Sequence, residues 1–410
     1  MEATVKAYNR VLSMAGVTIF CKKNWNSKKW LTFQILTLLS IFFAIISSTA
    51  FTFSCLPDLH LSIESAVVAS TFYITFLTLY LYLGNKRKFE NFLTEMVFND
   101  PALENPFIKY VLNSRSKGDK MRELKSLVIS SQERLLRVSR FLSQMYSFCI
   151  AFVVTLYMFA PMYTSKVRED NSTRILPLDM SFPWSTNNIV IYILTFMFQV
   201  HVGYLCSIGF ASFITLLLLF ILQIRRQLNI LSLILYNFNE MVLEITGGKS
   251  DDWEPACDFL LSLCVGHYLK TKRFARELNK VYKPYFLGLV LSSISLEGVC
   301  FVKIALLQEL TLHLLKYGVH LTLLMVGICI FSYQGQMIDD ACAELEAAAT
   351  EKWYIFNRQH QKKLLIFLIA LSQRMPVYIY GSVTLTFETF TWFVKTGMSF
   401  FTLMMSVLEK

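Results

Sequence analysis

The sequence is poor in charged side chains and lacks the short motifs by which most enzymes and metal sites are recognised. Asp, Glu, Lys and Arg make up only 17% of its 410 residues, well below their share in soluble domains. The nine cysteines are scattered and form no Cys-x-x-Cys pair. This distribution argues against a disulfide framework and against a zinc site.

Catalytic signatures are also missing. The six histidines form no His-x-x-x-His pair, and the chain contains neither a glycine-rich phosphate loop nor a Gly-x-Ser-x-Gly elbow. We therefore expect no catalytic residue, no bound metal and no cofactor. The apolar run at residues 11–20 is too short to cross a bilayer, and no small-residue cleavage site follows it. It predicts an interfacial or re-entrant helix rather than a signal peptide.

Apolar side chains dominate what remains. They make up 54% of the residues, with 35 phenylalanines, and they gather in runs of the length, about 20 residues, that a bilayer requires. The sequence predicts an all-α, polytopic membrane protein formed as one domain over residues 1–410. We expect seven spans, at about residues 30–54, 61–84, 141–163, 188–224, 284–307, 317–336 and 382–408.

The basic residues predict the orientation of these spans. A net charge of +10 could suggest a nucleic-acid partner, but the cations cluster between spans, with six in residues 1–29 and twelve in residues 85–140. By the positive-inside rule these segments are cytoplasmic, so the amino terminus lies inside and the carboxyl terminus outside. The single glycosylation sequon, at Asn171, falls on the expected outer side. A G-protein-coupled receptor has the opposite arrangement.

Helical patterns continue past the expected cytoplasmic ends of spans four to seven. The apolar periodicity of the fourth span runs on towards residue 242, and the fifth span is preceded by a long amphipathic, basic stretch. These continuations exceed what a bilayer needs. We therefore expect residues 225–283 and 337–381 to form a helical cytoplasmic bundle that serves as an anchor.

The last span carries a stripe of polar side chains. When the chain is treated as a helix from Val377 onward, the hydrophilic positions follow one another at steps of three or four and share one face: Thr384, Glu388, Thr391, Lys395, Ser399, Thr402 and Ser406. Such a stripe either lines a water-filled pore formed by several copies or packs as a polar seam on neighbouring helices. The charges of Glu388 and Lys395 favour water, because buried membrane charges are costly.

The same region carries a family resemblance. Over residues 335–403 the order and spacing of the motifs resemble the carboxyl-terminal signature of insect odorant receptors: Gly335-Gln336, Asp339-Asp340, Ala347-Ala348-Ala349, Trp353-Tyr354, the segment 371–376, the segment 386–390 and the segment 394–403. The resemblance implies a plasma-membrane protein of sensory neurons that works as a subunit of a tetrameric, ligand-gated, non-selective cation channel, in most cases with an obligate co-receptor.

In that family the last helix lines the pore. The match implies a hydrophobic gate at Leu403 and Val407, each one residue beyond a member of the polar stripe and so about 100° further around the helix. The expected pore and gate residues are thus Lys395, Ser399, Thr402, Leu403, Ser406 and Val407. A rotation of the helix could present either the apolar or the polar set to the pore.

Two departures from related sequences indicate which kind of subunit this is. The co-receptor has a long insertion between spans four and five and a Gln near its carboxyl end, whereas this chain has a short connection and Ser406 at the Gln position. Gustatory receptors end in a Thr-Tyr pair followed by a Gln-Phe pair. This chain has Ser399-Phe400 in place of Thr-Tyr and lacks the Gln. The chain thus resembles a tuning subunit. An orphan chemoreceptor coupled to another effector, or a gustatory-receptor-like channel, remains the alternative.

For ligand recognition the sequence offers composition rather than a pattern. Aromatic residues crowd several spans, and apolar pockets with one or two polar anchors suit small volatile molecules. The resemblance implies a pocket in the outer half of spans two to six. The candidates at that depth are Phe72, Tyr73, Phe76, Phe152, Tyr157, Tyr192, Phe196, Gln199 and His201, of which Tyr192, Gln199 and His201 are the expected polar anchors.

Overall fold

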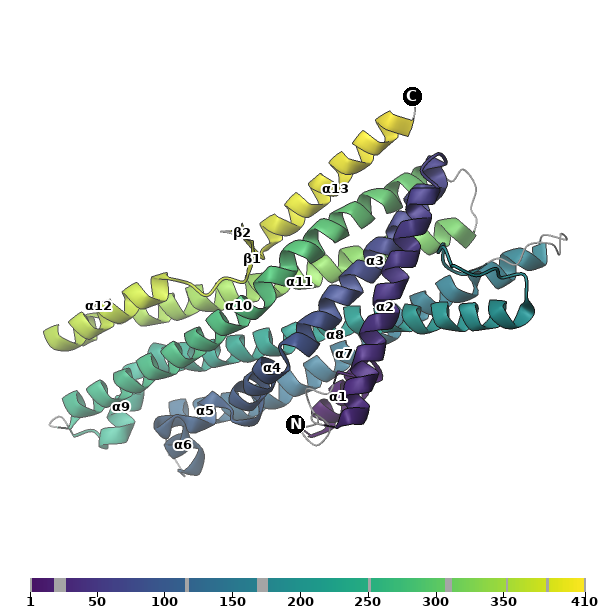
Figure 1. The fold of residues 1–410 in the computed structure, drawn as a ribbon. Helices are drawn as coiled ribbons and strands as arrows, with labels where there is room; N and C mark the ends of the chain where they lie inside the picture. The colour runs from purple at the N-terminus through teal and green to yellow at the C-terminus, as the bar shows by residue number, and fades with distance from the viewer. Residues whose placement is uncertain are drawn as a thin grey trace.

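The computed structural model describes residues 2–17, 27–114, 118–167, 176–249, 252–306, 312–351, 353–380 and 383–408. The sequon residue Asn171 lies outside these ranges, and the side chain of Val407 lies outside the described side chains. Figure 1 shows an elongated molecule built almost entirely from long helices, which cross one another at different angles.

The first part of the chain alternates long helices with a group of short ones. These elements are α1 (Glu2–Met14), α2 (Lys28–Ser54), α3 (Leu59–Gly84), α4 (Lys86–Leu93), the π-helical turn η2 (Thr94–Phe98), α5 (Pro101–Glu104), α6 (Pro106–Asn113) and α7 (Asp119–Val167). The second part contains α8 (Ile189–Tyr236), α9 (Phe238–Thr246), α10 (Trp253–Leu306), α11 (Leu312–Glu351), η3 (Trp353–Ile355), α12 (Arg358–Ser372), the strands β1 (Tyr378–Tyr380) and β2 (Val383–Thr384), and α13 (Phe387–Leu408).

Four helices are much longer than a bilayer requires. Helices α7, α8, α10 and α11 contain 49, 48, 54 and 40 residues. At 1.5 Å per residue α10 is about 80 Å long, whereas a span needs only about 30 Å. It continues through Pro284, the residue at which the expected fifth span begins. The helical continuations expected of spans four to six are present in α8, α10 and α11, and α7, which holds the third expected span, continues as well. That these continuations form a cytoplasmic anchor stays a prediction.

Six helices of the described residues are long and apolar enough to cross a membrane: α2, α3, α7, α8, α10 and α11. The chain is thus an all-α, polytopic membrane protein, as the sequence predicts. Helix α13 occupies the place of the expected seventh span and has 22 residues, but it is not among these six. Its polar stripe and Lys395 lower its hydropathy. That α13 spans the membrane stays a prediction.

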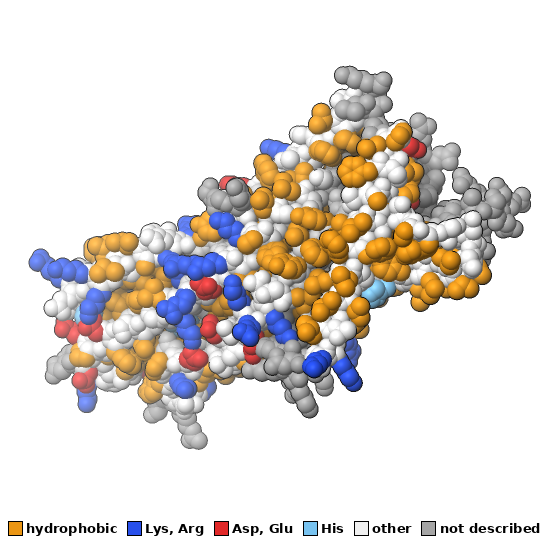
Figure 2. Space-filling model, viewed as in Figure 1, with side chains coloured by type: hydrophobic (Ala, Val, Ile, Leu, Met, Phe, Trp, Pro, Cys, Tyr) orange, Lys and Arg blue, Asp and Glu red, His pale blue; other side chains and the backbone are white. Residues whose placement is uncertain are grey.

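Charged and apolar side chains gather at opposite ends of the molecule. Figure 2 shows Lys, Arg, Asp and Glu gathered over the end that holds α4–α6, α9 and α12, which we call the charged half, and apolar side chains over the end that holds α2, α3 and α13, which we call the apolar half. The helices α7, α8, α10 and α11 run through both halves. The charged half includes α4–α6, which lie outside the expected anchor at residues 225–283 and 337–381, and the separation into a membrane part and an anchor stays a prediction.

The carboxyl-terminal segment departs from the sequence-based expectation. The prediction of a helix from Val377 onward was wrong, because residues 376–380 are extended and β1 pairs with β2 in an antiparallel hairpin. Asn279 of α10 holds this segment: its side-chain amide donates to the Pro376 carbonyl (2.6 Å), and its side-chain oxygen accepts from the Tyr378 N–H (3.2 Å). Helix α13 therefore begins at Phe387, later than the expected span at 382–408.

A buried polar network joins four segments in the charged half. The Asp100 carboxylate accepts from the Ala102 N–H at the start of α5, from Arg226 Nη1 (2.7 Å) and from Gln227 Nε2 (3.0 Å). Arg226 also donates to Ser131 Oγ on α7, and the Gln227 side-chain oxygen lies 2.9 Å from a ring nitrogen of His267 on α10. Each buried polar group named here thus has a partner, as a stable interior requires.

Candidate functional site

The polar stripe of α13 is exposed along the helix. Glu388, Thr391, Lys395, Ser399, Thr402 and Ser406 all lie on the open side, while Thr384 belongs to β2. The hydroxyl groups of the four Ser and Thr residues of the stripe on α13 donate to carbonyls of their own helix. Among the described residues of this chain the stripe therefore packs on no other helix. Water, lipid or another chain can therefore cover it.

The opposite face of α13 packs closely on α10. Gly397 is buried there, and a Cβ built on it would stand 2.3 Å from the side-chain carboxyl carbon of Glu297. Glu297 itself is completely buried, and its two carboxyl oxygens have no hydrogen-bond partner among the described residues. The contact between α10 and α13 thus depends on a glycine and encloses an unpaired carboxyl group.

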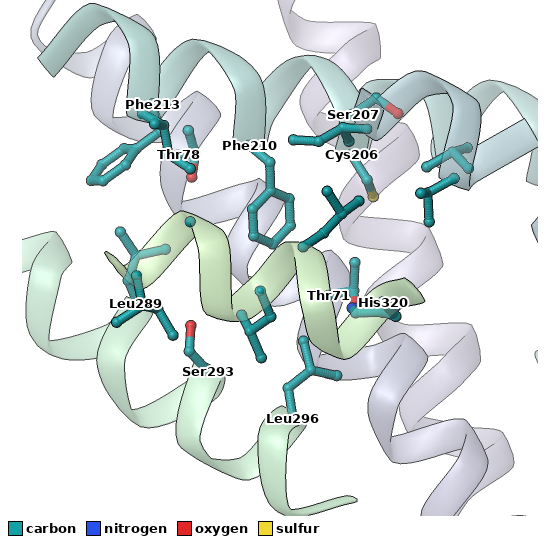
Figure 3. A pocket seen from close by; sticks show the side chains of 18 of the residues that line it. Thr71, Thr78, Cys206, Ser207, Phe210, Phe213, Leu289, Ser293, Leu296 and His320 are labelled. Atoms are coloured by element: carbon teal, nitrogen blue, oxygen red, sulfur yellow. The ribbon is translucent and has the colours of Figure 1, made fainter. Parts of the chain in front are cut away.

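A cavity of about 180 Å³ lies within the apolar half. Its walls come from α3, α7, α8, α10 and α11, from Leu178 in the connection before α8, and from Leu385 and Phe393 in the carboxyl-terminal segment. In Figure 3, Phe210 of α8 projects between the facing helices, with Phe213 and Thr78 towards one end and Thr71 and His320 towards the other. Nearly all of its lining is aliphatic or aromatic.

Few polar groups interrupt this lining. The clearest is a hydrogen-bonded pair, in which the Tyr157 hydroxyl lies 3.0 Å from His320 Nδ1. Thr71 lies at the same end, and Ser293 projects from α10. Such a cavity can hold a small, mainly apolar molecule and offer it one or two hydrogen bonds, because dispersion and burial of area would supply most of the affinity.

Two of the nine sequence-based candidates line this cavity, namely Phe72 and Tyr157. Tyr73 and Phe152 are exposed on the outer surface of the helices. Phe76 stacks on Tyr80, with ring centroids 6.1 Å apart, and does not reach the cavity.

The three expected polar anchors also lie elsewhere. Gln199 is buried, but its side chain accepts from the Leu178 N–H (3.1 Å) and donates to the Leu178 carbonyl (2.9 Å), so it fixes the connection before α8. Tyr192 packs against Phe196, with ring centroids 6.3 Å apart, and neither residue lines the cavity. His201 is exposed and faces a different groove, between α1, α7 and α8.

Sequence reasoning missed several lining residues. His320 appeared only as one of six scattered histidines, although it shares a helical face with Leu324 and Gly327, which also line the cavity. The spacing of Gly203, Cys206 and Phe210 on α8 gives a comparable signal. Nothing in the local sequence indicates that Leu385 and Phe393 reach the cavity, because that depends on the hairpin before α13.

Comparisons with known proteins agree on one family. The sequence profile described as 7tm Odorant receptor matches residues 58–398. Odorant receptor 82a of Drosophila melanogaster is 20% identical over 277 residues, which cover 66% of this chain and 69% of that receptor. Odorant receptor 49a of the same species is 24% identical over 159 residues, covering 38% of this chain and 39% of that receptor.

Solved structures extend the likeness to the fold. The insect olfactory receptor OR5 from Machilis hrabei, solved in complex with eugenol, matches with a TM-score of 0.78 at 13% sequence identity, and the match covers 99% of this chain and 98% of that one. A second structure of the same receptor gives a TM-score of 0.77 at 12% identity, with the same coverage. At this identity the likeness concerns the fold alone.

Proposed function

This chain belongs to the odorant receptor family of insects, and from that premise we propose that it is the ligand-sensing subunit of a ligand-gated, non-selective cation channel. The odorant would bind in the cavity of the apolar half, and the pore would be lined by α13 from each of four subunits. The subunit would act as a tuning subunit beside a co-receptor in the plasma membrane.

One observation supports this coupling more than any other: the cavity and α13 share a wall. Phe393 of α13 and Leu385 just before it both line the cavity, and both are almost completely buried. A ligand that fills the cavity therefore presses on the segment that carries the exposed polar stripe. Since packed interiors switch between discrete arrangements rather than deform smoothly, a small displacement of Phe393 can move the whole helix.

The stripe suits the wall of a cation pore. Its Ser and Thr hydroxyls already donate to the helix backbone, so their oxygen lone pairs remain available to a hydrated cation. Leu403, which is 60% exposed, would form the apolar constriction together with Val407. Lys395 and Glu388 are exposed, and a charged side chain exposed to lipid is costly in free energy, so these two are expected to contact water or a neighbouring subunit.

The cavity supports a ligand of the volatile class. The similar OR5 receptor was solved with eugenol, a small aromatic phenol, and a cavity of about 180 Å³ suits molecules of modest size. Here the aromatic lining and the Tyr157–His320 pair would favour a ligand with an apolar body and one hydroxyl or carbonyl group. A hydrogen bond to that group would contribute about 1 kcal/mol to the binding free energy of the ligand, the usual contribution of one hydrogen bond.

Whole-cell current tests the proposal. The chain would be expressed in a heterologous cell with and without an insect co-receptor and exposed to a panel of small volatiles, with no nucleotide added. We expect rapid cation current only in cells that express both proteins, and we expect Phe393→Ala to reduce it at equal surface expression. Ile369→Ala on α12, at a side chain that is 58% exposed and does not line the cavity, is the matched control.

The alternative makes a different prediction. If both proteins reach the surface and the panel evokes only slow signals that depend on G proteins, the chain is a chemoreceptor coupled to another effector. Current in cells that express the chain alone would contradict its role as a tuning subunit.

A further inference from the structure

A second hollow lies on the other side of the contact between α7 and α8. This groove has a volume of about 360 Å³ and is formed by the end of α1, one face of α7 and one face of α8. Next to its lining residues in the sequence, Phe148 and Phe152 of α7 are exposed apolar side chains, and so is Met197, one turn before His201 on α8. Because α7 and α8 are both candidate spans, we expect the groove to open towards the lipid and not towards water.

The groove contains hydroxyl groups that lack a partner. Ser147 Oγ and Ser207 Oγ are both buried and have no hydrogen-bond partner among the described residues. Serine on a membrane helix normally donates to a carbonyl of the preceding turn, as Ser40 of α2 does at 2.9 Å from the Leu36 carbonyl. In an apolar surrounding an unpaired hydroxyl costs free energy, so these two point to a bound polar group.

The remaining lining restricts the chemistry of that group. Among the residues that the structure describes, the groove walls contain no Lys or Arg, so they offer no partner for a phosphate or carboxylate headgroup. Apart from the two serines, His201 and Tyr204, the walls are aliphatic, and Tyr204 already bonds to Thr155 Oγ1 at 2.9 Å. An uncharged molecule with one hydrogen-bonding group on an apolar body matches this lining.

The groove adjoins the ligand cavity. Ser207 lines both, and in Figure 3 its hydroxyl is turned away from the centre of the cavity, whereas the Cys206 sulfur points into it. Small residues keep the partition thin: Gly203 lies on the cavity side, where a Cβ would stand 2.7 Å from Met158 Cε, and Ala151 lies on the groove side. A molecule in the groove would therefore contact a residue of α8 that also lines the cavity.

We propose that the groove between α1, α7 and α8 is a second binding site, occupied by an uncharged amphiphile with one hydroxyl group that enters from the bilayer. Ser147 and Ser207 bind the hydroxyl, and the aliphatic walls hold the apolar body. The proposal of this site rests on the residues that line the groove and is independent of whether the protein is a channel. When the amphiphile is bound, it limits how close helices α7 and α8 can come to each other near Ser207.

Photolabelling tests the proposal on the full chain in lipid nanodiscs. The probe is a sterol that carries a diazirine on its ring system, and a diazirine-bearing phosphatidylcholine serves as the control lipid. We expect the sterol to label peptides that contain residues 145–151 and 201–208, with excess unlabelled sterol competing. Equal labelling of these peptides by the phosphatidylcholine would overturn the proposal, since it would show ordinary contact with bilayer lipid.

Two variants make the test specific to the groove. Ser147→Ala removes one hydroxyl without touching the ligand cavity, and we expect sterol labelling to fall about five-fold, the effect of one hydrogen bond. Ala151→Phe fills the groove and should abolish the labelling. Ser40→Ala, whose hydroxyl is already bonded within its own helix, is the matched control and should leave labelling unchanged.

Stability measurements separate the two outcomes further. If the groove is empty, Ser147→Ala removes an unpaired hydroxyl and should raise the thermal stability of the protein with and without sterol, and the proposal is wrong. If a hydroxyl binds there, added sterol should stabilise the wild-type chain more than Ser147→Ala. Should Ala151→Phe fail to elute as a monodisperse protein, Ser147→Ala and the competition experiment decide the matter.

Discussion

Two buried carboxyl groups, Asp100 in the charged half and Glu297 in the apolar half, lie in opposite surroundings. Asp100 meets a guanidinium, a side-chain amide and a backbone N–H, and both it and Arg226 have side chains that are only 3% exposed. Glu297 is equally buried but has no hydrogen-bond partner among the described residues. A buried charge is tolerated when paired and hydrogen-bonded, and is costly otherwise.

The difference indicates which contacts are fixed and which can change. The network around Asp100 joins α5, α7, α8 and α10 through bonds that must all break together, so it suits an anchor. The contact between α10 and α13 instead encloses an uncompensated group against a glycine. We expect the charged half to hold its arrangement while α13 changes position against α10.

The largest expected effect comes from opening the Asp100 network. Asp100→Ala leaves the Arg226 guanidinium buried without its partner, which should cost about 3–5 kcal/mol of folding free energy. Surface expression and thermal unfolding of the purified chain measure this loss. Normal stability of Asp100→Ala would mean that the network does not hold the charged half together.

Gly397→Ala should have the next largest effect. The added methyl group meets the Glu297 carboxyl, and overpacking of this kind typically costs about 1–3 kcal/mol. Because α13 can then no longer dock on α10, Phe393 leaves the cavity wall, and we expect ligand-evoked current to fall about ten-fold or more, the equivalent of 1.4 kcal/mol. The measurement is current at saturating ligand, normalised to surface protein.

Two further variants sharpen that test. Glu297→Ala makes room for the methyl group, so the double variant with Gly397→Ala should recover current. Gly266→Ala, also in α10, adds a methyl group where nothing lies within 4 Å, and it should leave current unchanged. A failure of Glu297→Ala to rescue would show that Gly397 acts through some other contact.

A smaller effect is expected at the polar end of the cavity. His320→Phe keeps a ring but removes the hydrogen bond to Tyr157. For ligands with one hydroxyl or carbonyl group we expect the half-maximal concentration to rise about five-fold, whereas hydrocarbons of similar shape should be unaffected. Dose–response curves for such a matched pair of ligands provide the check, and an equal shift for both would argue that His320 acts only by packing.

The smallest effect is expected at the surface of the charged half. Lys120 and Glu123 form an ion pair at 3.2 Å, but their side chains are 44% and 50% exposed. Water and salt screen such pairs, so Lys120→Ala should change neither thermal stability nor current measurably. If Lys120→Ala lost as much thermal stability as Asp100→Ala, a buried ion pair would not contribute more to stability than an exposed one.

The sequence predicts the fold better than the site, and α13 shows why. Its polar stripe follows from local periodicity, and the structure places six of the seven predicted positions on one face of the helix, while Thr384 lies in β2. The start of the helix does not follow, since Val377 is held in an extended segment by the side chain of Asn279, almost a hundred positions earlier in the chain. A long-range contact here overrides local preference.

The cavity was harder to predict for a related reason. On helices that are apolar all round, composition does not say which face is turned inward. Phe72 and Tyr157 lie on inward faces, while Tyr73 and Phe152 lie on outward ones, and nothing in their types separates them. His201 and Gln199 were plausible anchors by type, but one faces the second groove and the other fixes the connection before α8.

The most direct test of the account is the accessibility of single cysteines on α13 in the functioning channel. Cysteines would be placed at Ser399 and Thr402 on the stripe, and at Met404 beside α10 as the control. A charged thiol reagent applied from outside should reduce the current at the two stripe positions, faster when ligand is present, and leave the Met404 variant unaffected. If the stripe cysteines do not react while the Met404 cysteine does, α13 does not line the pore with its polar face.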